Sequence, residues 1–334
     1  MDSKLINLVN AMQGCKIMII GDMVADVYLE GKISRISREA PVLILEHGGE
    51  IVVPGGAANT VHNAATLGGE VFAVGVIGED SVGRELSQVL AGKGVNTAGL
   101  IVDQSRPTIT KTRVMAGGQS TVRQQVVRID QEKKEPLSGN VKNEILTYIK
   151  SHIRHMDVVV MSDYGSNTVS PEVISTVIEG CNEAGIPSIV DSRYNILAFT
   201  GITVVKQNES EAAAAVGRDF LDDASLVQTG QTILSKLNAQ AVLITRGPDG
   251  MTLFEQTRKL TNIPVTNKSE VYDVTGAGDT VVAAMSLALA ARASYHEAAC
   301  LANYAAGVVV RKPGTATVSP GELKDAIGVH NEDS

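Results

Sequence analysis

Asp273-Val-Thr-Gly-Ala-Gly-Asp279, together with the apolar run TVVAAMSLALAA at residues 280–291, is the most informative part of the chain. Small residues before a long apolar run predict a buried helix that begins close to Asp279. Gly276, Ala277 and Gly278 are expected to leave backbone N–H groups free at the positive end of the helix dipole, where an anion can bind. Asp279 would lie beside that anion. It could accept a hydroxyl proton during phosphoryl transfer, or it could simply pair with the helix dipole in a glycine-rich cap.

The composition predicts the fold class. The chain has 334 residues, of which 44% are hydrophobic and only 3% aromatic, with no Trp. A large aliphatic core of this kind is typical of parallel strands covered by helices on both faces. One large α/β domain with a small appendage fits this length.

Charge and cysteine content exclude several classes of protein. The net charge is −8 without a basic tail, which disfavours nucleic acid as a partner. The three cysteines show no C-x-x-C spacing, so neither a disulfide framework nor a zinc site is expected. The N-terminus does not resemble a signal peptide, and the longest apolar-rich run, residues 281–293, is too short to cross a bilayer. We therefore expect a cytoplasmic protein that does not associate with membranes.

The rhythm of apolar segments changes along the chain. The first half crowds short strand-like segments together, and several of them alternate polar and apolar residues; they lie at 26–33, 41–46, 51–54, 71–77, 100–103, 108–116 and 121–129. The second half alternates strands with helices, the strands being at 157–161, 187–191, 202–206 and 241–246. This pattern predicts a doubly wound α/β sheet in a single domain, residues 1–334. A small antiparallel β-sheet lid is expected from about 26–54 and 100–130.

Four motifs in order resemble those of the PfkB/ribokinase family of carbohydrate kinases. Residues 273–279 look like the second family signature, and Gly55-Gly56-Ala-Ala-Asn59 resembles the sugar-binding turn of the first. Asn208-Glu-Ser-Glu211 is similar to the N-x-x-E motif, and Thr245-Arg-Gly247-Pro-Asp-Gly250 to the nucleotide loop. The chain is identified as a member of this family, which implies a ribokinase-like fold and an ATP-dependent kinase.

The resemblance assigns roles to the residues on the nucleotide side. It implies catalysis by Asp279 with the turn Gly276, Ala277 and Gly278, and use of ATP with Mg²⁺. Glu211 is expected to reach Mg²⁺ through water, because Mg²⁺ usually keeps several waters. A monovalent cation such as K⁺ is implied near Asp273 and Thr275. The nucleotide itself is expected to contact Asn208, Glu211, Thr245, Gly247, Gly250, Thr275 and Asn303.

A second group is expected to bind the sugar substrate. Asp22, Asp26 and Asp163 follow or flank apolar strands, where α/β sheets place ligands, and their carboxylates can accept hydrogen bonds from hydroxyls. Gly55, Gly56 and Asn59 form the predicted sugar turn. Basic residues of the predicted lid supply donors for a substrate phosphate, with Arg193 as a further candidate; they are Arg35, Arg38, Lys111, Arg113, Arg123 and Arg128. Turn capping and solvated strand faces are the alternative explanations for these residues.

Further stretches resemble the branch of the family that phosphorylates D-glycero-β-D-manno-heptose 7-phosphate at its C1 hydroxyl, on the route to ADP-heptose and lipopolysaccharide. Among them are residues 21–26, 34–41, 107–111 and Ser162-Asp163-Tyr164. Gly165-Ser166-Asn167 and Asp191-Ser192-Arg193 depart from the branch, which usually has a Lys-Gly run and Asp-Pro-Lys. A kinase for another sugar or nucleoside, and a non-catalytic sensor on the same fold, remain alternatives. A homodimer is expected because lid sheets have edges that can pair.

Overall fold

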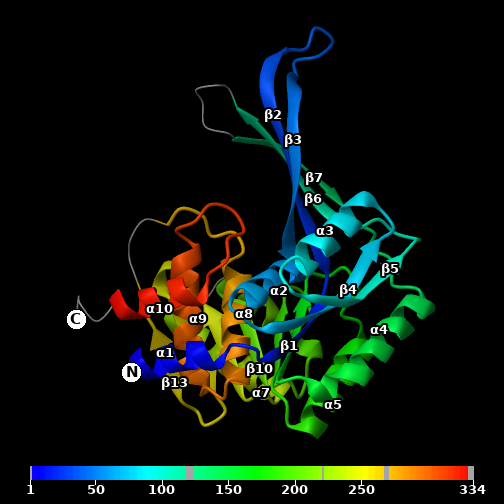
Figure 1. The fold of residues 1–334 in the computed structure, drawn as a ribbon. Coiled ribbons are helices and arrows are strands. Elements are labelled where there is room, and N and C mark those ends of the chain that lie inside the picture. Colours follow the sequence, from blue (N-terminus) through cyan, green and yellow to red (C-terminus); the bar gives the residue numbers. More distant parts are fainter. Residues whose placement is uncertain (1, 118–123, 220–221, 267–270, 330–334) are drawn as a thin grey trace.

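The computed structural model describes residues 2–117, 124–219, 222–266 and 271–329. They form one large sheet flanked by helices and one small sheet that extends away from it (Figure 1). The α/β class predicted from the sequence is confirmed.

The large sheet has the strand order β13-β12-β11-β10-β9-β8-β1-β4-β5. The strands from β11 to β5 are parallel to their neighbours, and β12 and β13 add an antiparallel edge. The bounds are β1 Lys16–Gly21, β4 Glu70–Gly78, β5 Asn96–Asp103, β8 Val158–Asp163, β9 Ser188–Ser192, β10 Val204–Asn208, β11 Ala241–Thr245, β12 Met251–Glu255 and β13 Leu260–Ile263. The predicted strands of the second half of the chain correspond to β8, β9, β10 and β11.

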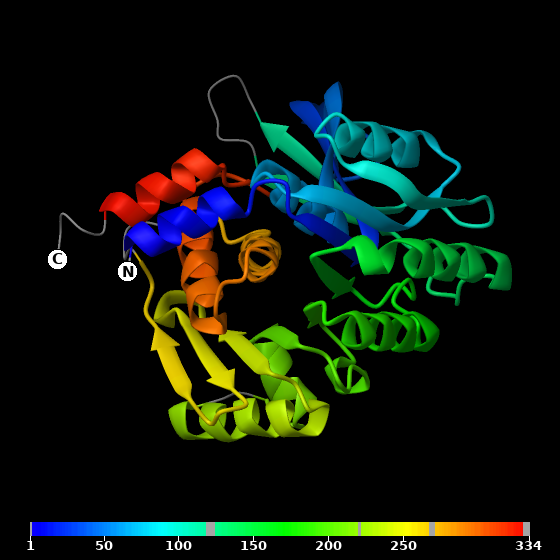
Figure 2. The same cartoon turned by 60° about the horizontal axis from the view of Figure 1, so that its bottom comes forward.

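Helices cover both faces of this sheet, because each central strand has apolar side chains on both sides. In β1, Ile17 and Ile19 belong to one buried cluster, and Met18 and Ile20 belong to the other. The helices are α1 Asp2–Ala11, α2 Ala57–Thr66, α3 Ser81–Ala91, α4 Gly139–His152, α5 Pro171–Ala184, α6 Glu209–Ala215, α7 Asp223–Leu237, α8 Ala277–Ala290, α9 Tyr295–Val309 and α10 Pro320–Val329. Figure 2 shows α1 and α10 side by side, so both ends of the described chain lie together.

The helix α8 is the most buried helical segment near the carboxyl ends of the strands. Every residue from Asp279 to Ala290 is buried, as its apolar sequence predicts. It packs against α9 and α2. The buried helix predicted to begin close to Asp279 thus corresponds to α8.

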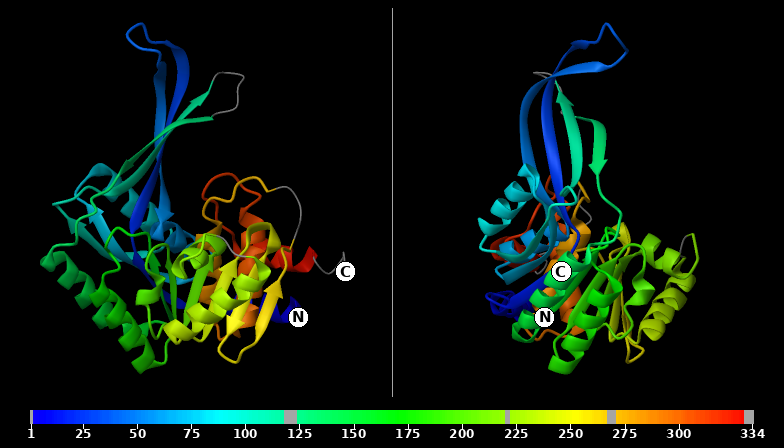
Figure 3. Two further views of the ribbon diagram at one scale, coloured as in Figure 1. Left: turned by 180° about the vertical axis from the view of Figure 1, so that it is seen from behind. Right: turned by 90° about the vertical axis from the view of Figure 1, so that its right-hand side faces the viewer.

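The small sheet consists of β3 Leu43–Gly56, β2 Met23–Ile36, β6 Ile109–Gly117 and β7 Gln124–Gln131, in that order. The β2–β3 hairpin extends well beyond the large sheet (Figures 1 and 3). Eight apolar residues of this sheet and its tip are exposed: Ile33, Ile36, Val42, Leu43, Ile51, Val126, Val127 and Ile129.

Two predictions about the small sheet were wrong. Residues 100–103 belong to β5 of the large sheet, as residues 71–77 belong to β4, so the second lid segment begins at Ile109. The sheet is also not purely antiparallel, because its central strands β2 and β6 pair in parallel. Alternation of polar and apolar residues shows which face of a strand is buried, but it does not identify the neighbouring strand.

Candidate active site

A polar cavity of about 310 Å³ lies where β8, β9 and β10 end and α8 begins. Open α/β sheets place ligands at this carboxyl edge. The cavity is lined by Asp163, Tyr164, Asp191, Arg193, Lys206, Asn208, Glu211, Val274, Thr275, Gly276, Gly278 and Asp279. Segments far apart in the sequence therefore bring together the predicted base, the glycine turn and the N-x-x-E motif.

Asp279 projects from the first turn of α8 into this region and is 7% exposed. Its Oδ2 accepts a hydrogen bond from Asn59 Nδ2 at 2.7 Å, and its Oδ1 accepts one from the Tyr164 hydroxyl at 2.7 Å. The Thr60 hydroxyl also donates to Oδ1, at 3.3 Å. Burial raises the pKa of Asp279, while the hydrogen bonds from Tyr164 and Asn59 oppose that rise. The result is a carboxylate that is more basic than an exposed aspartate.

The glycine turn before α8 requires glycine at position 276. Gly276 has φ +77°, and a Cβ there would lie 2.5 Å from Asn59 Nδ2, which holds Asp279. The amides of Gly276 and Gly278 donate no hydrogen bond within the described part of the chain. The prediction for Ala277 was wrong, because its N–H donates to the Val274 carbonyl at 3.2 Å. The turn tightens at that residue, so two amides, not three, remain open to an anion.

Lys206 adds a cation that the sequence did not reveal. Lys206 belongs to β10 and is 4% exposed. Its Nζ lies 2.8 Å from Asp191 Oδ2. A Cβ on Gly278 would lie 2.9 Å from that Nζ, so the ammonium group lies against Gly278 of the glycine turn. Burial alone would lower the pKa of Lys206, but the Asp191 and Glu211 carboxylates raise it above its usual value. Lys206 is therefore a charged donor beside the open amides.

Asn208 and Glu211 form a reciprocal cap at the start of α6. The Asn208 N–H donates to Glu211 Oε2 at 2.9 Å, and the Glu211 N–H donates to Asn208 Oδ1 at 2.9 Å. Burial raises the pKa of Glu211, and the nearby Asp191 carboxylate adds to the effect. No three His, Cys, Asp or Glu side chains converge as a metal cage in the described ranges. Glu211 forms this cap and also lines the cavity.

A second, mainly apolar cavity of about 740 Å³ adjoins the first, and both are lined by Val274 and Gly278. Four residues predicted to contact the nucleotide line it: Thr245, Gly247, Gly250 and Asn303. Gly247 and Gly250 adopt φ +54° and +82°. The Asn303 amide donates to the Pro264 carbonyl at 2.7 Å, so it fixes a wall of this cavity. An apolar chamber leading to open amides has the layout that a nucleotide base and its phosphates require.

Asp26 lies where the small sheet meets the large one. It is 4% exposed, and its Oδ1 forms an ion pair with Arg113 Nη1 at 2.8 Å. A Cβ on Gly55 would lie 2.7 Å from Asp26 Cγ, so the carboxylate fits only against a glycine. Gly56 has φ +52° and is the N-cap residue of α2. The predicted sugar turn and Asp26 are thus in contact.

Lys111 of β6 approaches the cavity from the small sheet. Its Nζ lies 5.6 Å from the centre of the Tyr164 ring, and the Arg193 guanidinium lies 4.4 Å from the same centre. Burial lowers the pKa of Lys111, and Arg193 lowers it further. Two cations from different sheets therefore meet at Tyr164.

The side chains of Asp22, Asn59 and Asp163, predicted to bind the sugar, form hydrogen bonds within the protein. Asp22 is fully buried and accepts backbone hydrogen bonds from residues 164, 166 and 168 at 2.9, 3.0 and 3.2 Å. Asn59 is also fully buried, and its amide is committed to Asp279. Asp163 lines the cavity, but it accepts hydrogen bonds from Gly165 N and Ser192 Oγ. Asp22 and Asp163 therefore hold the backbone of the loop after β8, and Asn59 holds the Asp279 carboxylate.

Three of the basic residues predicted to meet a substrate phosphate, Arg35, Arg38 and Arg128, do not converge on the cavity. Arg35 and Arg38 are exposed, and Arg35 lies on the outer half of β2. Arg128 is exposed on β7 and forms two 2.8 Å hydrogen bonds with Asp130. Arg123 lies outside the described residues. The alternation of residues along these strands predicted basic faces near the substrate. Arg35, however, lies on the part of the long hairpin that extends away from the site.

Asp273 and Thr275 form a compact turn before α8. Asp273 Oδ1 accepts from Thr275 N at 2.9 Å, and Oδ2 accepts from Gly314 N at 3.0 Å. Burial alone would raise the pKa of Asp273, but these hydrogen bonds lower it below its usual value. The Asp273 carboxylate is therefore ionised at the mouth of the glycine turn.

Sequence reasoning missed Tyr164, Lys206 and Asp191 as members of the site. Tyr164 follows β8 directly, and Lys206 lies in β10 two residues before Asn208, so each is next to a recognised motif. A lysine directly after the apolar pair Val204–Val205 of a strand was the available signal for Lys206, because buried lysines need a partner. No comparable signal identifies Tyr164.

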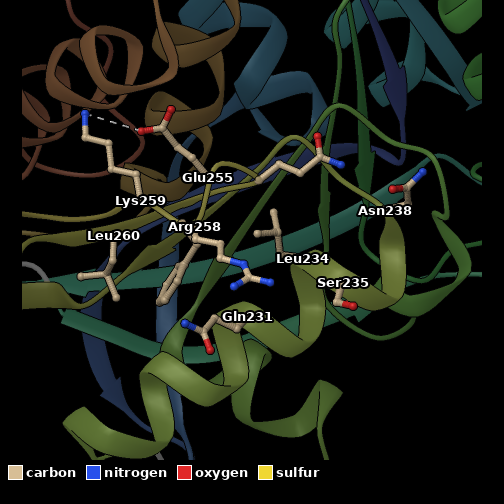
Figure 4. A pocket seen from close by; sticks show the side chains of 10 residues that line it. Gln231, Leu234, Ser235, Asn238, Glu255, Arg258, Lys259 and Leu260 are labelled. Carbon is tan, nitrogen blue, oxygen red and sulfur yellow. Dashed lines mark ion pairs between the residues drawn. The ribbon is translucent and has the colours of Figure 1, made fainter.

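A separate hollow of about 540 Å³ lies between α7 and the β12–β13 hairpin (Figure 4). Its charged residues include Glu255 and Lys259, which form an ion pair at 3.8 Å. It shares no lining residue with the two cavities above.

Among the described helices, none combines the length and apolar character needed to span a bilayer.

Similar folds occur in solved structures. Phosphofructokinase-2 from Escherichia coli in complex with potassium superposes with a TM-score of 0.76 at 20% identity, covering 96% of this chain and 99% of that one. Arabidopsis thaliana ribokinase complexed with ribose and ATP gives a TM-score of 0.70 at 19% identity, covering 94% and 99%. At such identities the similarity shows the fold alone.

Sequence comparison goes further. Bifunctional protein HldE of Trichlorobacter lovleyi is 39% identical over 336 residues, which cover 100% of this chain and 67% of that protein. Bifunctional protein HldE of Geobacter metallireducens is 40% identical over 318 residues, covering 95% and 64%. The chain thus spans about two thirds of the length of these relatives. The family model described as pfkB family carbohydrate kinase matches residues 15–321, and the chain therefore belongs to this family of carbohydrate kinases.

Proposed function

We propose that this chain transfers the γ-phosphoryl group of ATP to the C1 hydroxyl of D-glycero-β-D-manno-heptose 7-phosphate, a step toward ADP-heptose and lipopolysaccharide. The observation that carries the kinase chemistry is the position of Asp279 beside the open amides of Gly276 and Gly278. The choice of heptose rests on the motif resemblance and on the similarity to the two HldE proteins. We further propose that residues 1–334 act as one kinase domain in which the small sheet is the lid.

The residues of the polar cavity divide the work of phosphoryl transfer. Asp279 accepts the proton of the attacking sugar hydroxyl, which increases the electron density on that oxygen. The Gly276 and Gly278 amides and the Lys206 ammonium donate to the oxygens of the transferring phosphoryl group as charge develops on them. Because these donors are fixed before ATP binds, little reorganisation is needed during the reaction.

The oxygen-rich wall of the cavity fits Mg²⁺. Four carboxylates line the cavity, from Asp163, Asp191, Glu211 and Asp279, against the two cations Lys206 and Arg193. A hard divalent cation suits such a surplus of oxygen ligands, and Glu211 with Asn208 would hold it through water. When bound together with ATP, Mg²⁺ neutralises phosphate charge. Asp273 and Thr275 are the residues that would hold a monovalent cation such as K⁺.

The substrate side of the cavity offers separate groups for the sugar and its distal phosphate. Asp26 can accept hydrogen bonds from sugar hydroxyls across the Gly55–Gly56 turn, with Arg113 as its counter-ion. Lys111 and Arg193 are the cations closest to Tyr164 and supply charge-assisted donors for a phosphate. Arg193 stands where related enzymes usually have lysine, and its planar fork favours two-point binding of phosphate oxygens.

An ADP-release assay with MgATP tests this assignment on a panel of acceptors. Turnover with D-glycero-D-manno-heptose 7-phosphate and not with the unphosphorylated heptose is the expected result. Turnover with nucleosides or free hexoses would instead support a different kinase specificity. Binding of sugar and ATP, measured calorimetrically, without any ADP release would support a sensor.

Filling the apolar cavity is expected to weaken ATP selectively. Ala306→Leu adds bulk to the cavity wall formed by α9. Overpacking of this kind costs about 1–3 kcal/mol, which corresponds to a rise of roughly fivefold to 150-fold in KM for ATP. The KM for the sugar phosphate serves as the internal control and is expected to stay constant. Equal increases in both KM values would contradict the assignment of this cavity to the nucleotide.

We also propose that the chain forms a homodimer through the small sheet and acts in the cytoplasm, where ATP is available. Exposed apolar residues occur on three of its strands, including Ile51 and Ile129, and exposed apolar faces commonly mark interfaces. Sedimentation is expected to show a dimer for the wild type and a monomer for the double variant Ile51→Asp/Ile129→Asp. A wild-type monomer at micromolar concentration would refute the proposal.

A further inference from the structure

Among the described residues, Tyr164 is the aromatic side chain that donates a hydrogen bond to the proposed base. It follows β8 and lies within the cavity wall, and its hydroxyl donates to Asp279 Oδ1 at 2.7 Å. Burial raises the pKa of Tyr164 well above its usual value, and the Asp279 carboxylate raises it further. The phenol therefore keeps its proton and acts as a donor to Asp279.

The backbone of Tyr164 is held by a buried carboxylate. Asp22 accepts the Tyr164 N–H at 2.9 Å and the N–H groups of Ser166 and Thr168 at 3.0 and 3.2 Å. The side chain of Ser166 donates to Glu132 Oε1 at 2.6 Å, and the Asn167 amide donates to the Lys134 carbonyl at 2.9 Å. The loop is thus tied both to the end of β1 and to the segment after β7, which restricts where the phenol can lie.

The ring of Tyr164 is held by two cations. Arg193, which follows β9, lies 4.4 Å from its centre, and Lys111 of β6 lies 5.6 Å from it. Cations at such distances from an aromatic face are attracted by its quadrupole. Tyr164 therefore connects a lid residue, a core residue and the base.

We propose that Tyr164 is a positioning residue that orients the Asp279 carboxylate toward the acceptor hydroxyl and keeps it ionised for proton abstraction. This proposal rests on the proposed function, because it assumes that Asp279 is the base. Asn59 fixes Oδ2 and Tyr164 fixes Oδ1, so the two together define the plane of the carboxylate. Thr60 donates a longer hydrogen bond of 3.3 Å to Oδ1.

Other charged groups act on Asp279 from every side of the cavity. Asp191 of β9 raises its pKa and Lys206 of β10 lowers it. Asp163, Glu211 and Arg193 line the same cavity. These groups are unchanged when the Tyr164 hydroxyl is removed, so a change in the pH dependence of the reaction reports on the phenol itself. Loss of a donor to a carboxylate favours its protonated form, so the pKa of Asp279 rises.

Tyr164→Phe separates this role from packing, because phenylalanine keeps the ring between Lys111 and Arg193. With MgATP and D-glycero-D-manno-heptose 7-phosphate, kcat at neutral pH is expected to fall about tenfold or more, as for loss of a hydrogen bond to a charged group. The acidic limb of the kcat profile is expected to move to higher pH by about one unit. The KM for ATP is expected to remain unchanged. Tyr148→Phe is the matched control, because the Tyr148 hydroxyl lies 3.5 Å from Asn96 Oδ1 and does not contact the site.

The outcomes are distinguishable. A Tyr164→Phe enzyme with wild-type kcat and an unmoved acidic limb overturns the positioning role, provided that Asp279→Asn is inactive in the same assay. If Asp279→Asn retains turnover, the proposed base itself is wrong and the Tyr164 proposal falls with it. Tyr164→Gln, which retains a donor that does not titrate, is expected to recover part of the pH shift and serves as the second variant if Tyr164→Phe does not fold.

Discussion

Replacing Asp279 by Asn is expected to lower kcat by about 10²–10⁴-fold while ATP still binds, because general-base catalysis contributes on that order. Asn is nearly isosteric but cannot take up a proton, and its single carbonyl oxygen can replace only one of the two carboxylate oxygens that accept from Asn59 and Tyr164. Stopped-time ADP release measures kcat, and calorimetry measures ATP affinity. Asp325→Asn, at an exposed position of α10, is the control for a change of one charge.

The pH dependence of the wild type gives an independent check on Asp279. Burial raises its pKa, so the active, deprotonated form is lost as the pH falls through a value above that of an ordinary aspartate. Activity is accordingly expected to decline on the acidic side earlier than for an exposed carboxylate. Near wild-type turnover in Asp279→Asn, with an unchanged acidic limb, would remove Asp279 from the reaction.

Lys206→Met is expected to lower kcat by about 10²–10³-fold, as is typical when one donor to a developing negative charge is removed. The Lys206 ammonium lies against Gly278, beside the turn where the transferring phosphoryl group is expected. The substitution also leaves the buried Asp191 without its cation, which costs about 3–5 kcal/mol of folding free energy. Reduced activity could therefore reflect reduced stability.

The double variant Asp191→Asn/Lys206→Met separates the two effects. Removing both charges of a buried pair is much less destabilising than removing one. Denaturant unfolding is therefore expected to show stability recovered relative to the single variant, while kcat stays low. Recovery of kcat together with stability would mean that Lys206 only balances Asp191.

The sequence predicted those parts of the site that are formed by local segments. The glycine turn, Asp279 and the N-x-x-E cap each lie within a few residues of one another and of a helix start, so their arrangement follows from helix geometry. The partners of Asp279 could not be predicted in the same way. Asn59 and Tyr164 are separated from it by 220 and 115 residues, and only the packing of α2 and β8 against α8 brings them together.

The strand pairing of the small sheet could not be predicted from the sequence either. The alternation of polar and apolar residues identified most of its strands, but the parallel pairing of β2 with β6 joins segments about 85 residues apart, roughly from Val24 to Ile109. Pairing at that range depends on where the large sheet places the strand ends, and this information is not in any local window. For the same reason Arg35 was predicted near a substrate phosphate, although it lies far out on the hairpin.

The strand β3 runs without a break into α2, so the far tip of the hairpin and the Asn59–Thr60 pair share one continuous stretch of backbone. Gly56 stands at the junction in a left-handed conformation. Swinging of the hairpin would turn about this point and would be transmitted mechanically to the start of α2. The emission of a fluorophore attached near Glu39 is therefore expected to change when the polar cavity beside Asp279 is occupied.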